Sequence, residues 1–210
     1  MVKKNVAVLV SGGGTNLQAL IDSEKNGIIK SGTISLVVSN KENAYALERA
    51  KNAGIPTEIV VRKEYPDVAS YTAAIIDTLK KYEADLVVYA GFMTILDEQI
   101  VKEYNGRMMN VHPSLIPSFC GVGMYGLHVH EAALARGVKL TGATVHFVNE
   151  ECDGGPIILQ KAVAIENGDT PEVLQARVMH EAEWKILPEA VDLFCRDKLK
   201  IEGRTVIISE

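Results

Sequence analysis

The first half of the chain alternates short apolar runs with stretches of helical periodicity. Four runs predict buried strands: Asn5–Val10, Ile34–Val38, Glu58–Val61 and Asp85–Ala90. Between them, apolar residues spaced three to five apart predict three helices: Thr15–Glu24, Asn43–Ala53 and Asp67–Tyr82. Strands that alternate with helices are typical of a parallel sheet covered on both faces. The pattern therefore predicts an α/β fold with a Rossmann-like, mostly parallel sheet and helices on both faces.

The second half is organised differently. Three further strands are expected, over Met108–Val111, Thr144–Val148 and Ile157–Ile165. Two helices are expected over Leu127–Arg136 and Pro171–Phe194, the second behind an Asp169-Thr170 cap, and Ile201 with Thr205–Ile208 suggests a terminal hairpin. The stretch Pro113–Gly126 has two prolines and three glycines, and we expect a long ordered loop there. Loops of this length in compact domains are usually functional or disordered.

Composition narrows the range of partners. A chain of 210 residues with 47% apolar residues fits one domain, residues 1–210, with a substantial core. The net charge of -5 and the lack of a basic stripe argue against a nucleic-acid binder, while a small anionic ligand stays possible. Cys120, Cys152 and Cys195 show no metal-ligand spacing, and no signal peptide or membrane span is expected. A cytoplasmic protein without a metal is predicted, as a monomer or homodimer.

A glycine-rich segment, Ser11–Asn16, joins the first strand to the first helix. Such a junction presents backbone N–H groups and a helix N-terminus to an anion, and glycine lets the backbone approach a phosphate closely. A side chain added at Gly14 is therefore expected to clash with that phosphate. Leu17 stands where a dinucleotide fingerprint needs its third glycine, and no Walker ending is present. The segment indicates a small molecule with one phosphate; the alternative is a tight turn alone.

Three polar residues could carry acyl chemistry: Asn110, His112 and Asp153. In an extended segment residues two apart face the same side, and Pro113 favours extended backbone at His112. An amide and an imidazole can hold an oxyanion, and a carboxylate can tune the imidazole and move protons. Taken singly, each has a structural reading, as a backbone cap, a satisfied buried histidine and a turn residue. Four other histidines have weaker cases, with His130 expected on a helix surface and His146 within a strand: His128, His130, His146 and His180.

Together these motifs resemble the glycinamide ribonucleotide formyltransferases, folate-dependent enzymes of purine synthesis. The likeness runs along most of the chain, through Val8–Gln18, Ala90–Met93, Asn110–Pro117, Gly142–Val148 and Asp153–Ile158. The Asn-x-His-Pro-Ser and Asp-x-Gly pieces also resemble the formyltransferase domains of methionyl-tRNA formyltransferase and formyltetrahydrofolate deformylase. The glycine-rich loop favours the purine enzymes. A formyltransferase fold is implied, with phosphate binding in the N-terminal half and catalysis and folate binding in the C-terminal half.

The resemblance also implies a reaction and a set of site residues. The formyl group of 10-formyltetrahydrofolate would pass to the amine of glycinamide ribonucleotide; the alternative is hydrolysis of the same folate or another folate-dependent formyl transfer. Asn110, His112 and Asp153 would be catalytic. The resemblance assigns the substrate phosphate and ribose to Gly13, Gly14, Thr15, Asn16 and Glu183. It assigns the folate pocket, largely through backbone, to Met93, Thr94, Ile95, Leu96, Asn110, Asn149, Glu150, Glu151, Cys152 and Asp153.

Three residues depart from the family pattern. Thr94 stands where some members carry arginine, and Val68 lies near a place where a basic residue is common. Cys152 replaces a larger apolar residue directly before Asp153. The first two departures put side-chain contacts to folate in doubt, and none of the three removes the chemistry.

Overall fold

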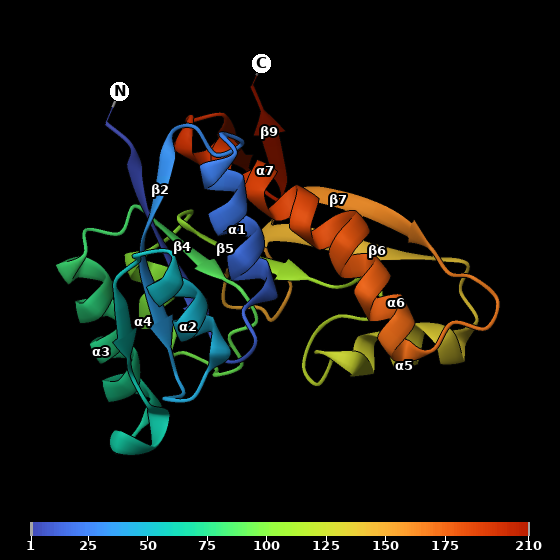
Figure 1. Cartoon of the computed structure of the whole chain (residues 1–210), viewed down its shortest axis with the longest axis horizontal. Coiled ribbons are helices and arrows are strands. Elements are labelled where there is room, and N and C mark those ends of the chain that lie inside the picture. Colours follow the sequence, from blue (N-terminus) through green and yellow to red (C-terminus); the bar gives the residue numbers. More distant parts are fainter. Residues whose placement is uncertain (1, 210) are drawn as a thin grey trace. The chain divides into compact units, whose positions relative to one another are not determined.

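The computed structural model describes residues 2–209, which divide into two compact units. The first unit ends at Met109 and the second begins at Asn110. Each unit is described by itself below (Figure 1). The expectation of one functional domain over residues 1–210 stays a prediction, because compactness alone does not show which residues act together.

The first unit is a parallel α/β sheet with its connecting helices. Its strands are β1 (Lys4–Val10), β2 (Gly32–Ser39), β3 (Thr57–Ile59), β4 (Leu86–Tyr89) and the start of β5 (Met108–His112). They are connected by α1 (Thr15–Lys25), α2 (Tyr45–Asn52), η1 (Arg62–Glu64), α3 (Val68–Lys81) and α4 (Gln99–Glu103). The strand order is β3-β2-β1-β4-β5, and β1 runs parallel to both β2 and β4. The four predicted strands and three predicted helices are confirmed, and the short η1 and α4 were not predicted.

The strand order explains why helices cover both faces of this sheet. The chain steps outward from β1 to β3, then returns to β4 and continues to β5. Right-handed crossovers in opposite directions place their helices on opposite faces. Accordingly α1 packs against α2, and α3 packs against α4 (Figure 1). The reversal between β1 and β4 lies beside the carboxyl end of β1, which is where open α/β sheets bind ligands.

Apolar runs and one helix face build the core of this unit. Val6–Val10 of β1 and Leu86–Val88 of β4 are fully buried, as strands covered on both faces require. Tyr71, Ile75 and Leu79 repeat every four residues on α3 and are also fully buried. The helix begins at a cap predicted by sequence, because the Asp67 carboxylate accepts the N–H of Ser70 at 2.7 Å.

The second unit combines a mixed sheet with three helices. Its strands are the rest of β5, β6 (Leu140–Phe147), β7 (Ile157–Ala164), β8 (Leu199–Glu202) and β9 (Thr205–Ile208), in the order β5-β6-β7-β9-β8. The β6–β7 and β8–β9 pairs are antiparallel, and β7 runs parallel to β9. The predicted α/β class with a mostly parallel sheet is confirmed. No helix within residues 2–209 has the length and apolar character needed to cross a bilayer.

The long C-terminal helix differs from its prediction in its middle. The helices of this unit are α5 (Leu127–Arg136), α6 (Pro171–Val178) and α7 (Trp184–Cys195), with the π-helical turn η2 (Met179–Glu183) between the last two. The start is as expected, since the Thr170 hydroxyl accepts the N–H of Val173. Pro188 lies inside α7 and cannot donate to the carbonyl of Trp184, four residues earlier. The π turn itself lies before Pro188, at Met179–Glu183, and such turns are frequent at functional sites.

Candidate active site

Strand β5 delivers two polar side chains at alternate positions. Its apolar residues, Met108, Met109 and Val111, are buried and hold the strand in place. Asn110 is half-buried and His112 is buried, and both side chains contact the carboxylate of Asp153. The structure therefore brings together the three residues that the sequence proposed as catalytic. Their role in catalysis stays a prediction.

A tight turn presents Asp153 to this strand. Asp153 has a φ of 56°, in the left-handed region, so its side chain leaves the turn in a direction set by the backbone. Gly155, two residues on, lies so close to β6 that an added Cβ would meet the carbonyl oxygen of Phe147 at 1.7 Å. The Asp-Gly-Gly-Pro turn is thus both a structural turn and the support of the carboxylate. The two interpretations of the motif are compatible.

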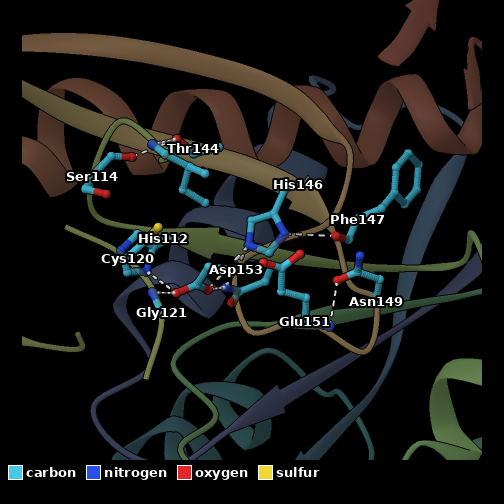
Figure 2. A network of polar contacts seen from close by, with 12 residues as sticks. His112, Ser114, Cys120, Gly121, Thr144, His146, Phe147, Asn149, Glu151 and Asp153 are labelled. Carbon is cyan, nitrogen blue, oxygen red and sulfur yellow. Dashed lines mark hydrogen bonds and ion pairs between the residues drawn. The ribbon is translucent and has the colours of Figure 1, made fainter. Parts of the chain in front are cut away.

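The Asp153 carboxylate lies at the centre of a polar network (Figure 2). One oxygen accepts the backbone N–H of Gly121 at 2.8 Å and lies 3.5 Å from His112 Nδ1. The other lies 3.5 Å from Asn110 Nδ2 and 3.6 Å from His146 Nε2. Burial alone would raise the pKa of Asp153, but the hydrogen bond from His146, the charge of His112 and the Gly121 N–H outweigh it and hold the pKa below its usual value. The carboxylate is therefore ionised at neutral pH.

Both ring nitrogens of His112 face oxygen acceptors. Nε2 lies 2.9 Å from the carbonyl oxygen of Phe119, and Nδ1 lies 3.5 Å from Asp153. An imidazole that donates from both nitrogens carries two protons and a positive charge. Each ring nitrogen of His112 thus has an oxygen acceptor within reach, so the ring is placed to act as a hydrogen-bond donor.

His146 also belongs to the network, which sequence reasoning did not expect. Its Nδ1 donates to the carbonyl oxygen of Phe147 at 2.9 Å, which leaves Nε2 facing Asn110 Nδ2 at 3.2 Å. The same Nε2 lies 3.6 Å from Asp153 and can donate to the carboxylate when it carries a proton. A signal for this placement was present in β6, where the polar Thr144 and His146 alternate with the apolar Val145 and Phe147.

Thr144 ties the segment after His112 to the same strand. Its hydroxyl donates to the carbonyl oxygen of Ser114 at 2.7 Å and accepts the N–H of Ile116 at 3.1 Å. The expectation of an ordered loop over Pro113–Gly126 is confirmed. By holding the loop, these bonds bring the Phe119 carbonyl and the Gly121 N–H to the network.

The remaining histidines lie outside this network. His128 is exposed and pairs with Glu131, and His180 packs edge-on against Trp184. His130 was expected on the surface of its helix, and that expectation is wrong, because the side chain is fully buried on α5. Burial, with a smaller contribution from the charge of His112, lowers the pKa of His130 to about 4. His130 is consequently neutral at physiological pH.

The glycine-rich segment lies in the first unit, between the end of β1 and the start of α1. Gly14 occupies the N-cap position in a left-handed conformation, with φ 70° and ψ 34°, and no side chain caps the helix there. The first backbone N–H groups of α1 are therefore available to an anion. Thr15 and Asn16 open the helix, and the Ser11 hydroxyl accepts the N–H of Met93 at 2.8 Å. Gly13 to Asn16 are thus together at the predicted position.

The structure gives Gly14 a second reason to be glycine. A Cβ built on Gly14 would meet the Cβ of Ala46, on α2, at 2.6 Å, whereas Gly12 and Gly13 have nothing within 4 Å. The clash expected for a larger residue at Gly14 thus occurs first with α2. A substitution at Gly13 is the cleaner test of phosphate binding.

The residues proposed for folate and ribose are distributed over both units. Met93 and Ile95 are exposed apolar side chains in the first unit, where Thr94 accepts a hydrogen bond from Asn40. The segment Asn149–Asp153 lies in the second unit, in the turn after β6, and Glu183 is buried at the end of η2. The hydroxyl of Thr94 is thereby engaged within its own unit. Nothing in these contacts assigns the residues to a ligand, so their binding roles stay predictions.

Metal-ligating residues are not grouped into a site in the part of the chain that the structure describes. No three His, Cys, Asp or Glu side chains among residues 2–209 are arranged to hold an ion. Cys120 and Cys152 are free thiols close enough to Asp153 to feel its charge. Burial, followed by the charge of Asp153, raises the pKa of each thiol, so both are protonated at neutral pH.

Several known proteins are similar to this chain in sequence and in structure. A model of the formyl transferase family matches residues 4–191. The phosphoribosylglycinamide formyltransferase of Escherichia coli is 43% identical over 197 residues, which are 94% of this chain and 90% of that protein. The trifunctional purine biosynthetic protein adenosine-3 of Bos taurus is 44% identical over 210 residues, 99% of this chain. This chain spans only 20% of the length of that protein.

A solved structure agrees with both. Glycinamide ribonucleotide transformylase 1 from Symbiobacterium toebii superposes with a TM-score of 0.93 at 42% sequence identity. The match covers 99% of this chain and 95% of that chain. The likeness therefore extends over the glycine-rich segment, the Asp153 network and the strands that carry them.

Proposed function

The chain belongs to the formyl transferase family, and we propose that it transfers a formyl group from 10-formyltetrahydrofolate to the amine of glycinamide ribonucleotide. The products are formylglycinamide ribonucleotide and tetrahydrofolate, in purine biosynthesis. The likeness to phosphoribosylglycinamide formyltransferases over nearly the whole chain supports this reaction. The structural observation that supports the reaction most strongly is that the side chains of Asn110 and His112 both contact the Asp153 carboxylate in one buried network.

The network supplies what formyl transfer needs at the reacting carbon. The amine attacks the formyl carbon, and negative charge develops on the formyl oxygen. The Asn110 amide N–H and the His112 imidazolium are the donors proposed to stabilise that charge. One preorganised donor of this kind contributes roughly 3 to 4 kcal/mol. The carbonyl of Phe119 holds the Nε2 proton of His112 in this structure, and we propose that the formyl oxygen replaces it as acceptor.

Asp153 is proposed to manage protons and charge. Its lowered pKa keeps the carboxylate ionised, 3.5 Å from His112 Nδ1, where it can accept a hydrogen bond from the ring. The same carboxylate can accept a proton from the attacking amine and return it, through water, to the leaving nitrogen. His146 and the Gly121 N–H hold the carboxylate in place for both tasks.

The two substrates would be held by features of different kinds. Gly13 to Asn16 would bind the phosphate through backbone N–H groups, and Glu183 would contact the ribose. The folate carries the one-carbon unit at the formyl level of oxidation. The exposed Met93 and Ile95 offer apolar surface suited to a flat ring, and the Asn149–Asp153 turn offers backbone polar groups.

The proposal is tested by product analysis. The protein is incubated with 10-formyltetrahydrofolate, with and without glycinamide ribonucleotide, and tetrahydrofolate, formate and formylglycinamide ribonucleotide are quantified. Tetrahydrofolate release that requires the ribonucleotide and equals the formylated product supports transfer. Formate release at the same rate without the ribonucleotide would instead establish the alternative, a formyltetrahydrofolate hydrolase. A cytoplasmic setting, the monomer or homodimer state and the lack of a metal requirement remain predictions.

A further inference from the structure

We propose that Arg49 is a positioning residue for the glycine-rich segment, acting through the carbonyl of Gly13 to aim the backbone N–H groups that receive the substrate phosphate. Arg49 lies on α2, at some distance in sequence from the segment, and no motif of the sequence singled it out. Its Nε donates to the carbonyl oxygen of Gly13 at 2.8 Å. This inference rests on the proposed function, because it deepens the assignment of the phosphate to Gly13–Asn16.

The planar peptide bond links the direction of each carbonyl to that of the next N–H. In a trans peptide the carbonyl and the following N–H point in opposite directions. Because Arg49 draws the Gly13 carbonyl toward α2, the N–H of Gly14 is turned away from α2. Arg49 thereby fixes the direction of a donor that it does not itself touch.

A second bond acts in the same way on the preceding peptide. The backbone N–H of Ala46, also on α2, donates to the carbonyl oxygen of Gly12 at 3.0 Å. The N–H of Gly13 is consequently turned away from α2 as well. Two successive N–H groups that point the same way form an anion-binding nest, beside the uncapped start of α1. Only the bond from Arg49 depends on a side chain, so it can be removed by substitution.

Arg49 is itself held in position from two sides. Its Nη1 donates to the Gln18 Oε1 on α1 at 3.0 Å, and its guanidinium lies 5.0 Å from the centre of the Tyr45 ring. Gln18 in turn donates to Asp22 at 2.9 Å. Since two of the three guanidinium nitrogens are engaged at fixed points, the side chain joins α1, α2 and the segment between them. A lysine at this position has one ammonium and could not make both bonds in the same geometry.

The experiment compares three variants of the full chain: Arg49→Met, Arg49→Lys and, as the matched control, Arg107→Met. Arg107 belongs to the same unit, also donates to a backbone carbonyl, that of Glu103, and also stacks on a tyrosine. Binding of glycinamide ribonucleotide is measured by isothermal titration calorimetry, which does not depend on formyl transfer. The KM for 10-formyltetrahydrofolate and the melting temperature are measured on the same samples.

Arg49→Met is expected to raise the Kd for the ribonucleotide at least about tenfold, the effect of losing a hydrogen bond from a charged group. Arg49→Lys should raise it less, because the charge is kept and the fork is lost. The KM for the folate should stay within about twofold of wild type in both, since the segment does not hold the folate. Arg107→Met should leave the ribonucleotide Kd unchanged.

The results that overturn the inference differ from those that overturn the proposed function. Wild-type protein that does not bind the ribonucleotide contradicts the proposed function. Wild-type protein that binds it, together with an unchanged Kd in Arg49→Met, contradicts the role of Arg49 alone. Equal weakening of both substrates in Arg49→Met would also contradict it, by showing a general structural effect. If Arg49→Met does not fold, Arg49→Lys decides in the same way, and an unchanged Kd there overturns the inference.

Discussion

The glycine-rich segment of the first unit and the Asp153 network of the second are built from different kinds of polar group. The segment has backbone groups as its donors, and their direction depends on bonds from α2. The network consists of ionisable side chains whose charges depend on one another. Backbone N–H groups do not titrate, whereas the imidazole and carboxylate do. The first region should therefore govern binding of a phosphate at any ordinary pH, and the second should govern chemistry that depends on pH.

The largest effects are expected from removing charge in the network. His112→Ala and Asp153→Asn should each lower kcat roughly a hundred- to ten-thousandfold, because each removes either the oxyanion donor or the proton carrier. The Kd for the ribonucleotide should change little. Because the proposed mechanism makes the two residues act as a unit, the double variant should be hardly slower than either single one.

A histidine outside the network provides the control. His128 is exposed on α5, and its Nδ1 pairs with the carboxylate of Glu131. His128→Ala should keep kcat within about twofold of wild type. Steady-state kinetics of wild type and these variants would sink the assignment of Asp153 if Asp153→Asn turned over at nearly the wild-type rate.

The arrangement of this network could be predicted only in part from the sequence. The spacing of Asn110 and His112, with Pro113 after them, indicated two side chains on one face of a strand. The tuning of Asp153 could not be predicted, because its partners Gly121 and His146 are distant in sequence and meet it only through tertiary folding. A histidine inside an apolar strand has the same local signal whether it faces a core or a site.

In the fold, too, features set by neighbouring residues could be predicted, whereas features set by residues distant in sequence could not. Apolar runs and caps such as Asp67 located the strands and helices of the first unit to within a few residues. The π turn at Met179–Glu183 has no periodic signature, since it interrupts an otherwise continuous helical pattern. The role of Arg49 was likewise hidden, because its acceptor, Gly13, is a backbone carbonyl of another element.

Neighbouring glycines separate packing from binding in the first region. Gly14→Ala should destabilise the protein by about 1 to 3 kcal/mol, because the new Cβ meets Ala46 and the left-handed φ is strained. Gly13→Ala has no such contact and should leave the free energy of unfolding within about 0.5 kcal/mol. Gly13→Ala should instead raise the Kd for the ribonucleotide. Urea unfolding and calorimetry test both; a normal Kd in a well-folded Gly13→Ala protein argues against phosphate binding there.

A second pair of glycines tests the support of Asp153. Gly155→Ala places a Cβ 1.7 Å from the backbone oxygen of Phe147 and should cost about 1 to 3 kcal/mol of unfolding free energy. At Gly154 the added Cβ meets only the side chain of Glu151, which can rotate away. Gly154→Ala should therefore be the milder change in both stability and kcat. Equally small effects of Gly155→Ala and Gly154→Ala on stability and kcat would show that the turn tolerates displacement.

The smallest expected effect is a shift in the pH dependence of the network. The lowered pKa of Asp153 keeps the carboxylate charged at neutral pH, and this charge is lost as the pH falls through that lowered value. His146→Leu removes the hydrogen bond that does most to lower the pKa, so the pKa of Asp153 should rise. The acid limb of the kcat profile should then move to higher pH. An acid limb that stays in place would mean that His146 does not tune Asp153.

The same shift has a consequence for stability. A carboxylate with a depressed pKa in the folded state stabilises the protein above its unfolded pKa, which is about 3.9. That contribution disappears as the pH falls through the lower folded pKa of Asp153. His146→Leu should therefore lose less of its stability than wild type in the acid range, as acid titration of the unfolding midpoint would show.

The separation of binding from chemistry is tested most directly by single-turnover kinetics. The rate of formyl transfer is measured with 10-formyltetrahydrofolate limiting relative to enzyme and with the ribonucleotide varied in excess of enzyme, for wild type, Arg49→Met and Asp153→Asn. Each titration gives a limiting rate and a half-saturating concentration. The account predicts that Arg49→Met keeps the limiting rate and needs more ribonucleotide, whereas Asp153→Asn loses the limiting rate and keeps the half-saturation point. A limiting rate that falls in Arg49→Met as far as in Asp153→Asn would contradict it.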